Sequence, residues 1–284
     1  MSLSAIRVPR ARRCPPALAR RAAAAMRRDG AVVLDGLFAP ALLRRLAARV
    51  LSGHASGALR RQGLVRDVAG RYAAVLPFEG PFLEPALFDP PALRGLLEGL
   101  LGPDYRIGSL ETVIAEPGAY EQHQHLDGAL RFDTALGGKK APFAGDLSGL
   151  PPHAVTLCVP LCEVTEENGP TAIWAGSHRE ALRAKPSSEA AIRRKYRQER
   201  VAGPLGRAFF FDYRVFHCGT ANLTREARPV LMLVFCRPWF RDQNLAEVHP
   251  RLVISPRALA RLTPARRELF ALAPSARRPL WRKR

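Results

Sequence analysis

The sequence predicts a mainly β fold with flanking helices, arranged as an antiparallel barrel or a jelly roll. Segments rich in β-formers follow one another through the centre of the chain, and Gly, Pro and Asn turns separate them. Helical patterns are concentrated before residue 102. No repeat or long linker divides the 284 residues, so we expect a single domain over residues 1–284. The predicted strands are Ser109–Glu116, Val155–Val164, Arg207–Asp212 and Val230–Arg237.

The N-terminal hundred residues alternate helix and strand signals. Residues 16–28 form an amphipathic pattern that Asp29-Gly30 ends, because glycine stops helices readily. A short apolar strand, Ala31–Leu34, follows, and then a second amphipathic helix over Ala39–Leu51. A third helix over Leu93–Leu101 ends at Gly102-Pro103. We expect residues 1–15 to be a flexible basic lead-in without a secretory signal, since no apolar stretch precedes the first helix.

Two segments are predicted to leave the core. Gly128–Pro151 is long and rich in glycine, and loops of this length in compact domains are usually functional. We therefore expect a lid over the site described below. Ala181–Glu199 is polar, charged and rich in helix formers, which predicts a surface segment between core strands.

The chain is strongly basic, with 44 Lys and Arg against 25 Asp and Glu and a net charge of +19. Such a field attracts polyanions, so a nucleic-acid-binding module is one interpretation. The arginines are scattered, however, and lack the interleaved aromatic residues of a nucleic-acid platform. We favour the composition of a GC-rich bacterial genome as the cause and expect neither nucleic acid nor a membrane span. Five cysteines without a secretory signal predict reduced thiols and a cytoplasmic protein.

Histidines and one aspartate have the spacing of a metal site. On an extended strand the side chains of His125 and Asp127 point to one face, so an imidazole and a carboxylate converge. His217 completes a 2-His-1-carboxylate set, which leaves coordination positions open on non-haem Fe(II). His123 shares that strand face and is the rival first ligand. We expect His123 instead to orient a metal-bound imidazole without binding the metal itself, or to contact the substrate.

Arg228 begins the apolar run Arg228-Pro229-Val230-Leu231, where a buried charge is costly unless it is paired. A carboxylate held bidentately by the guanidinium would supply that partner. The spacing of Cys158 and Cys162 resembles half of a zinc site. A structural zinc site needs four ligands, and no second close pair exists in the sequence, so core thiols are expected.

Taken together, these motifs resemble the phytanoyl-CoA dioxygenase family of Fe(II)- and 2-oxoglutarate-dependent oxygenases. The resemblance runs from about Asp29 to about Phe270. It rests on the eleven-residue step from His217 to Arg228 and on two further segments, Glu167-Asn168-Gly169-Pro170-Thr171 and Gly176-Ser177-His178. It implies a double-stranded β-helix core of the jelly-roll or cupin type and an iron site at His125, Asp127 and His217.

The resemblance also implies that oxoglutarate and O2 are co-substrates, with ascorbate as the reductant in vitro. Arg228 would bind the distal carboxylate of oxoglutarate, and Gln122 looks like a glutamine that some members use to hold it. Thr171 either adds a hydroxyl contact or serves the turn. Trp174 is the aromatic residue to test for substrate contact, and Gly176-Ser177-His178 is expected to be structural.

The expected activity is hydroxylation, or another oxidation, of an unactivated C–H in a small molecule of bacterial secondary metabolism. The carboxylate at Asp127 favours this over halogenation, because related halogenases carry Ala or Gly there. The alternatives are a non-catalytic jelly-roll protein that binds a metal or ligand, and the basic nucleic-acid-binding module. A monomer and a homodimer are both compatible with the sequence.

Overall fold

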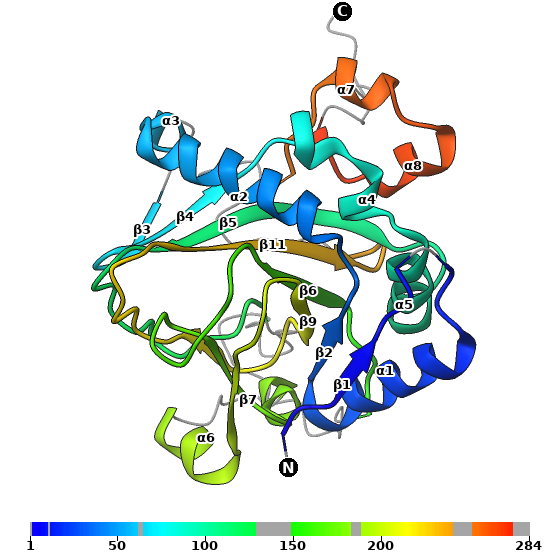
Figure 1. Cartoon of the computed structure of the whole chain (residues 1–284). Helices are drawn as coiled ribbons and strands as arrows, with labels where there is room; N and C mark the ends of the chain where they lie inside the picture. Colours follow the sequence, from blue (N-terminus) through cyan, green and yellow to red (C-terminus); the bar gives the residue numbers. More distant parts are fainter. Residues whose placement is uncertain are drawn as a thin grey trace, which may run out of the picture.

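A computed structural model describes residues 2–10, 12–61, 65–128, 149–182, 189–240 and 252–274. An eight-stranded sheet crosses the molecule, antiparallel except where the first strand pairs in parallel with the second (Figure 1). In sheet order its strands are β1 (Ala5–Arg7), β2 (Ala31–Asp35), β9 (Arg207–Asp212), β6 (Ala154–Pro160), β11 (Arg228–Cys236), β5 (Arg106–Ala115), β4 (Arg71–Val75) and β3 (Val65–Val68).

A smaller antiparallel sheet of three strands faces one end of the large sheet. Its strands, in order, are β10 (His217–Gly219), β7 (Thr171–Trp174) and β8 (Gln198–Val201). Ile173 and Val201 of the small sheet pack with Phe209, Phe211 and Val230 of the large sheet. Two facing sheets with a shared apolar core form a jelly roll, so the predicted fold class is confirmed.

Helices cover the other face of the large sheet, while α6 (Glu189–Lys195) lies by the small sheet on the opposite side of the molecule from α2 and α4 (Figure 1). Each helix of the covering layer except α3 begins with proline, whose fixed φ suits the first turn and whose missing N–H is not needed there. This layer comprises α1 (Pro16–Asp29), α2 (Pro40–Ala55), α3 (Ala58–Arg61), α4 (Pro85–Phe88), α5 (Pro91–Leu101), α7 (Pro256–Ala260) and α8 (Pro264–Leu269). Two 3-10 helices, η1 (Gly80–Leu83) and η2 (Ser177–Leu182), complete the structure.

Strand β11 divides its side chains between the helix-covered core and the space between the sheets. Leu231, Leu233 and Phe235 pack in the core beneath the helices. The alternate residues face the space between the sheets, as the period of two in a strand requires. A bulge near the end of β11 shifts the pairing with β5 after Val234. The same strand therefore stabilises the fold and lines the site.

Gly30 lies where α1, the β2–β9 strand pair and the 3-10 helix η2, which contains His178, meet. Its left-handed backbone (φ 73°) ends the helix, and its N–H donates to the Met26 carbonyl at 2.9 Å. Its carbonyl accepts from the Asp212 N–H at 2.8 Å. A Cβ at this position would lie 2.6 Å from Nδ1 of His178, so only glycine fits without rearrangement.

The segment expected to be a flexible lead-in, residues 1–15, contains a paired strand in the structure. Ala5–Arg7 pairs in parallel with β2 as strand β1, and Leu3, Ile6 and Val8 are buried. Alternation of these apolar side chains with exposed residues gives a half-buried edge strand, which the run of arginines conceals. Most of the expected lid, residues 129–148, lies outside the described residues. The expected surface segment 181–199 contains α6 and the start of β8.

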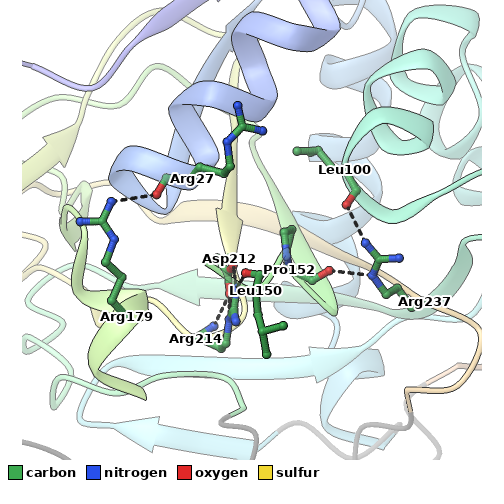
Figure 2. A network of polar contacts seen from close by, with 8 residues as sticks. All are labelled: Arg27, Leu100, Leu150, Pro152, Arg179, Asp212, Arg214 and Arg237. Carbon is green, nitrogen blue, oxygen red and sulfur yellow. Dashed lines mark hydrogen bonds and ion pairs between the residues drawn. The ribbon is translucent and has the colours of Figure 1, made fainter. Parts of the chain in front are cut away.

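Several arginines stabilise the interior by donating to backbone carbonyls, as Figure 2 shows. Arg214 is 1 % exposed and holds Asp212 bidentately, at 2.8 and 2.7 Å, while also donating to the carbonyl of Leu150 at 3.2 Å. Arg237 donates in the same way to the carbonyls of Pro152 and Leu100. Part of the basic composition is therefore internal.

All five cysteines lie in the described part of the chain, and none forms a disulfide. None of the described helices has both the length and the hydropathy needed to cross a membrane.

Candidate metal centre

His125, Asp127 and His217 converge in space, with their ligand atoms all within 4.8 Å of one another. Nε2 of His217 lies 3.6 Å from Oδ1 of Asp127, and the two imidazole centroids are 4.4 Å apart. His217 is the first residue of β10, whereas His125 and Asp127 lie on the segment that follows β5. Two imidazoles and one carboxylate at this separation match the donor set of a facial triad.

The two segments that carry the triad are held together by backbone hydrogen bonds. The N–H groups of His125 and His217 each donate to the other's carbonyl, at 3.0 and 2.9 Å. Further along, Gln122 N–H donates to the Gly219 carbonyl and Gly128 N–H donates to the Tyr213 carbonyl. The extended strand on which His125 and Asp127 were expected to share a face is not a regular strand in the structure. His125 makes an isolated bridge, and this pairing rather than strand alternation places the ligands.

Backbone carbonyls fix the orientation of both imidazoles. Nδ1 of His125 donates to the carbonyl of His123 at 2.9 Å, and Nδ1 of His217 donates to that of Val215 at 3.1 Å. Because a carbonyl only accepts, each Nδ1 carries the proton and each Nε2 is left with a lone pair for a metal. The side chain of His123 is exposed, so in this structure the residue acts on the site through its backbone.

The surroundings of His217 and Asp127 suit metal binding. Burial lowers the pKa of His217 to about 4, and the neighbouring His125 adds to this effect, so the imidazole is neutral near pH 7. Phe211 packs against the ring at 4.5 Å between centroids. The hydroxyl of Thr156 donates to Oδ2 of Asp127 at 3.0 Å, which orients the carboxylate.

A cavity of about 180 Å³ opens beside the triad, between the two sheets. Four strands of the large sheet form its floor, and β7 and β10 of the small sheet form its opposite wall. Gln122, Thr171 and Arg228 line the cavity together with the triad, so the sequence-predicted metal and oxoglutarate residues share one space.

Arg228 is a buried cation in the cavity, with 3 % of its surface exposed. Its Nε donates to the carbonyl of Asn168 at 3.2 Å. Burial lowers the pKa of its guanidinium, and within the described part of the chain no carboxylate forms an ion pair with it. A buried guanidinium of this kind is stabilised by an anion, and a carboxylate matches its planar fork.

The remaining predicted residues occupy different positions around the cavity. Oε1 of Gln122 accepts from the Gly219 N–H at 2.6 Å, which anchors the side chain to β10. Thr171 is the first residue of β7, and its side chain lines the cavity. Trp174 lies on the other face of the small sheet, where it packs with Ile192 of α6. It does not line the cavity.

The Gly176-Ser177-His178 segment supports the strand that carries His217. Oγ of Ser177 accepts from the Phe216 N–H at 2.9 Å, and His178 is buried beside Gly30. Sequence reasoning missed Thr156, Arg71 and Glu111, which also line the cavity. A polar residue within an otherwise apolar strand, as in Val155-Thr156-Leu157, was the sequence feature that could have identified a cavity-lining residue.

The fold and the site together define a jelly-roll protein with a candidate 2-His-1-carboxylate metal centre. Comparison with known families agrees with this class. The family model described as phytanoyl-CoA dioxygenase (PhyH) matches residues 26–230. The chain belongs to the phytanoyl-CoA dioxygenase family, which confirms the resemblance seen in the sequence.

Solved structures of similar fold include two enzymes from nogalamycin biosynthesis, SnoN and SnoK. The epimerase SnoN, in complex with Fe3+, alpha ketoglutarate and nogalamycin RO, is 23% identical with a TM-score of 0.61, over 82% of this chain and 90% of its own. AviO1 from Streptomyces viridochromogenes is 20% identical with a TM-score of 0.56, over 78% and 95%. The alpha ketoglutarate dependent carbocyclase SnoK is 18% identical with a TM-score of 0.54, over 84% and 94%. At these identities the likeness concerns the fold.

Proposed function

We propose that this protein is an Fe(II)- and 2-oxoglutarate-dependent oxygenase that oxidises an unactivated C–H of a small molecule. The observation that carries the proposal is one cavity lined by the open triad and by buried Arg228. Two imidazoles and a carboxylate suit Fe(II), and the guanidinium suits the distal carboxylate of oxoglutarate. Membership of the phytanoyl-CoA dioxygenase family supports the same activity.

The residues of the chain bind and orient the reactants. His125, Asp127 and His217 would hold Fe(II) and leave positions for oxoglutarate and O2. Bound iron would supply the activation of O2 and the oxidation of the C–H bond. The overall reaction converts the C–H, O2 and oxoglutarate into a C–OH, succinate and CO2. Val113, Val230 and other apolar side chains of the floor limit water in the cavity.

Natural-product biosynthesis is the setting that the comparisons favour. SnoN and SnoK act in the biosynthesis of nogalamycin, one as an epimerase and the other as a carbocyclase. We therefore place this protein with enzymes that tailor a small-molecule scaffold. Hydroxylation is the outcome we propose, because the intact Asp127 leaves no ligand position for a halide at the metal.

The test measures CO2 released from oxoglutarate labelled at C1 by protein loaded with Fe(II) and ascorbate. Slow release without substrate and faster release with a scaffold substrate are expected. Binding of oxoglutarate is followed separately under anaerobic conditions by the visible absorption of the Fe(II)–oxoglutarate complex. Iron and oxoglutarate binding without any CO2 release, across a substrate panel, would favour the non-catalytic ligand-binding alternative.

Arg228→Leu tests the co-substrate assignment. Loss of a buried charge pair costs about 3 kcal/mol, so we expect oxoglutarate affinity to fall roughly 100-fold while iron binding is kept. Arg225→Leu is the matched control, because Arg225 lies on the turn before β11 but is exposed. Equal oxoglutarate affinity in the two variants would contradict the role of Arg228.

A further inference from the structure

We infer that the substrate carries a planar aromatic ring, which stacks on an exposed aromatic surface at one end of the cavity. Trp239 and Phe240 form this surface, which we call the aromatic rim, in the turn that follows β11. The indole of Trp239 is 60 % exposed, although burial of so large an apolar side chain is favourable, and Phe240 is half-buried. The inference rests on the proposed function and names the class of its substrate.

The order of residues along the large sheet places the candidate metal centre between Arg228 and the aromatic rim. Strand β11 runs from Arg228, the proposed partner of oxoglutarate, along the cavity floor to Val234. Val234 pairs with Thr156, whose hydroxyl donates to the proposed metal ligand Asp127. Beyond Val234 the chain continues to the end of the strand and into the aromatic rim. On this wall the co-substrate residue, the metal ligand and the rim therefore follow one another.

The opposite wall of the cavity has the same order. Along the segment that carries the metal ligands, Gln122 comes first, then His125 and Asp127, and then Gly128. The N–H of Gly128 donates to the carbonyl of Tyr213 at 3.0 Å. The ring of Tyr213 is 5.7 Å from the phenyl ring of the aromatic rim, measured between centroids. Because oxoglutarate takes the arginine end, the substrate reaches the metal from the end that carries the rim.

The aromatic rim adjoins the segment that carries the metal ligands. A Cβ at Gly128 would lie 2.9 Å from Cδ1 of Tyr213 and 4.0 Å from Cζ of Phe240, so both rings lie against this backbone. Val234 lines the cavity and also belongs to the apolar cluster in which Tyr213 and Phe240 pack. A substrate whose reacting C–H lies at the metal can therefore extend over Phe240 onto Trp239.

The geometry of the aromatic rim favours an aromatic ring over a saturated one. The Trp239 and Phe240 rings are 6.2 Å apart between centroids and inclined at 82°. A substrate ring that lies parallel to the indole is therefore nearly perpendicular to the phenyl ring. Offset stacking and edge-to-face contact are the two arrangements that aromatic pairs prefer, and one ring can make both here. A saturated ring gains only the burial of its apolar surface.

Two probes with the same carbon skeleton test this inference: 2-naphthalenemethanol and its fully saturated decalin analogue. Calorimetry measures their binding to protein loaded with Fe(II) and oxoglutarate under anaerobic conditions. We expect the aromatic probe to bind roughly tenfold more tightly, because each aromatic contact adds to the burial of apolar area. Broadening of its proton NMR signals by paramagnetic Fe(II) should place the bound probe beside the metal.

Substitutions at the two ends of the cavity locate the preference. Trp239→Leu should remove most of it, since leucine keeps an apolar surface but offers no ring. Trp239→Phe should keep most of it, which distinguishes stacking from general support of the fold. Tyr120→Leu is the matched control and should keep the full preference. Tyr120 is also an exposed aromatic residue (68 %), but its carbonyl accepts from Arg71 at the arginine end of the cavity.

The remaining outcomes separate this inference from the proposed function. Equal affinity for the two probes, no measurable binding of either, or signals that Fe(II) does not broaden would overturn the inference. Retention of the preference in Trp239→Leu, or an equal loss in Tyr120→Leu, would overturn it as well. In all these cases, oxoglutarate binding and CO2 release by the same protein would leave the proposed function intact. Protein that binds no oxoglutarate would overturn the proposed function, and this inference with it.

Discussion

The triad is divided between two segments of very different construction. His217 lies on β10, a short strand paired along its length with β7 and almost fully buried. His125 and Asp127 lie on an irregular segment that is half-buried and has one bridge, to His217 itself. One part of the candidate metal site is thus built into a sheet, and the other is aligned by hydrogen bonds to the first. Metal affinity should depend on both the ligands and these connections.

Removal of the proposed ligand on β10 should have the largest effect on metal affinity. His217→Ala leaves two ligands, so we expect metal affinity to fall by at least about 100-fold. Mutation of residues that only hydrogen bond to the ligands usually lowers metal affinity by about 10–100-fold. His123→Ala is the control, because only the backbone of His123 contacts the site. Metal content and Fe(II) titration give the measurement. Equal iron binding in the two variants would refute the assignment of His217.

A methyl group between the two segments should have the next largest effect. The Cβ of Gly219→Ala would lie 2.5 Å from Nη1 of Arg71 and 2.7 Å from Oε1 of Gln122. Overpacking of this kind costs about 1–3 kcal/mol of stability, and here it also separates the segments that carry the ligands. Denaturant unfolding and metal titration should both change. Gly149→Ala should alter neither, since nothing lies within 4 Å of its Cβ.

Removal of the hydrogen bond that orients Asp127 should lower metal affinity by a smaller amount. Thr156→Val removes the hydroxyl that donates to Asp127, and we expect metal affinity to fall about tenfold. Thr112→Val is the matched control on the next strand but one. The Thr112 hydroxyl donates to the Val230 carbonyl at 3.0 Å, so its loss should cost about 1 kcal/mol of stability and leave metal affinity unchanged. Similar metal affinities for the two variants would show that Asp127 is oriented without Thr156.

The pH dependence of stability should separate a buried site histidine from a buried structural one. Burial lowers the pKa of both His217 and His153 to about 4. Between pH 4 and 6.5 these two histidines bind protons in the unfolded chain but not in the folded chain. The free energy of unfolding therefore has its full value above pH 6.5 and decreases as the pH falls toward 4. The slope is at most about 1.4 kcal/mol per pH unit for each group.

His153→Phe should remove the structural contribution only. His153 is 1 % exposed and packs against Phe240 at 4.5 Å between ring centroids, so phenylalanine fits its aromatic surroundings. Urea unfolding of the metal-free protein from about pH 4.5 to about pH 7.5 should show a shallower slope for this variant. An unchanged slope would mean that His153 does not contribute.

The sequence predicted the parts of the molecule whose side chains carry a strong local signal. The long apolar strands around Leu157, Phe210 and Leu233 were found, as was the pairing of His125 and Asp127 with His217. Six strands were not predicted, because they are short and rely on pairing with other segments: β1, β3, β4, β7, β8 and β10. The positions of Thr156 and Glu111 in the cavity also depend on register between strands, which single-sequence patterns do not contain.

Gly30 has a consequence for exchanging parts among proteins of this fold. Its backbone ends α1, accepts a hydrogen bond from Asp212 where β9 ends, and leaves room for His178 of η2. A chimaera that takes the N-terminal helices from one protein and the jelly roll from another must therefore keep glycine at this junction. With any other residue there, the helical layer would dock out of position, and the mismatch would be transmitted to the loop that supports His217.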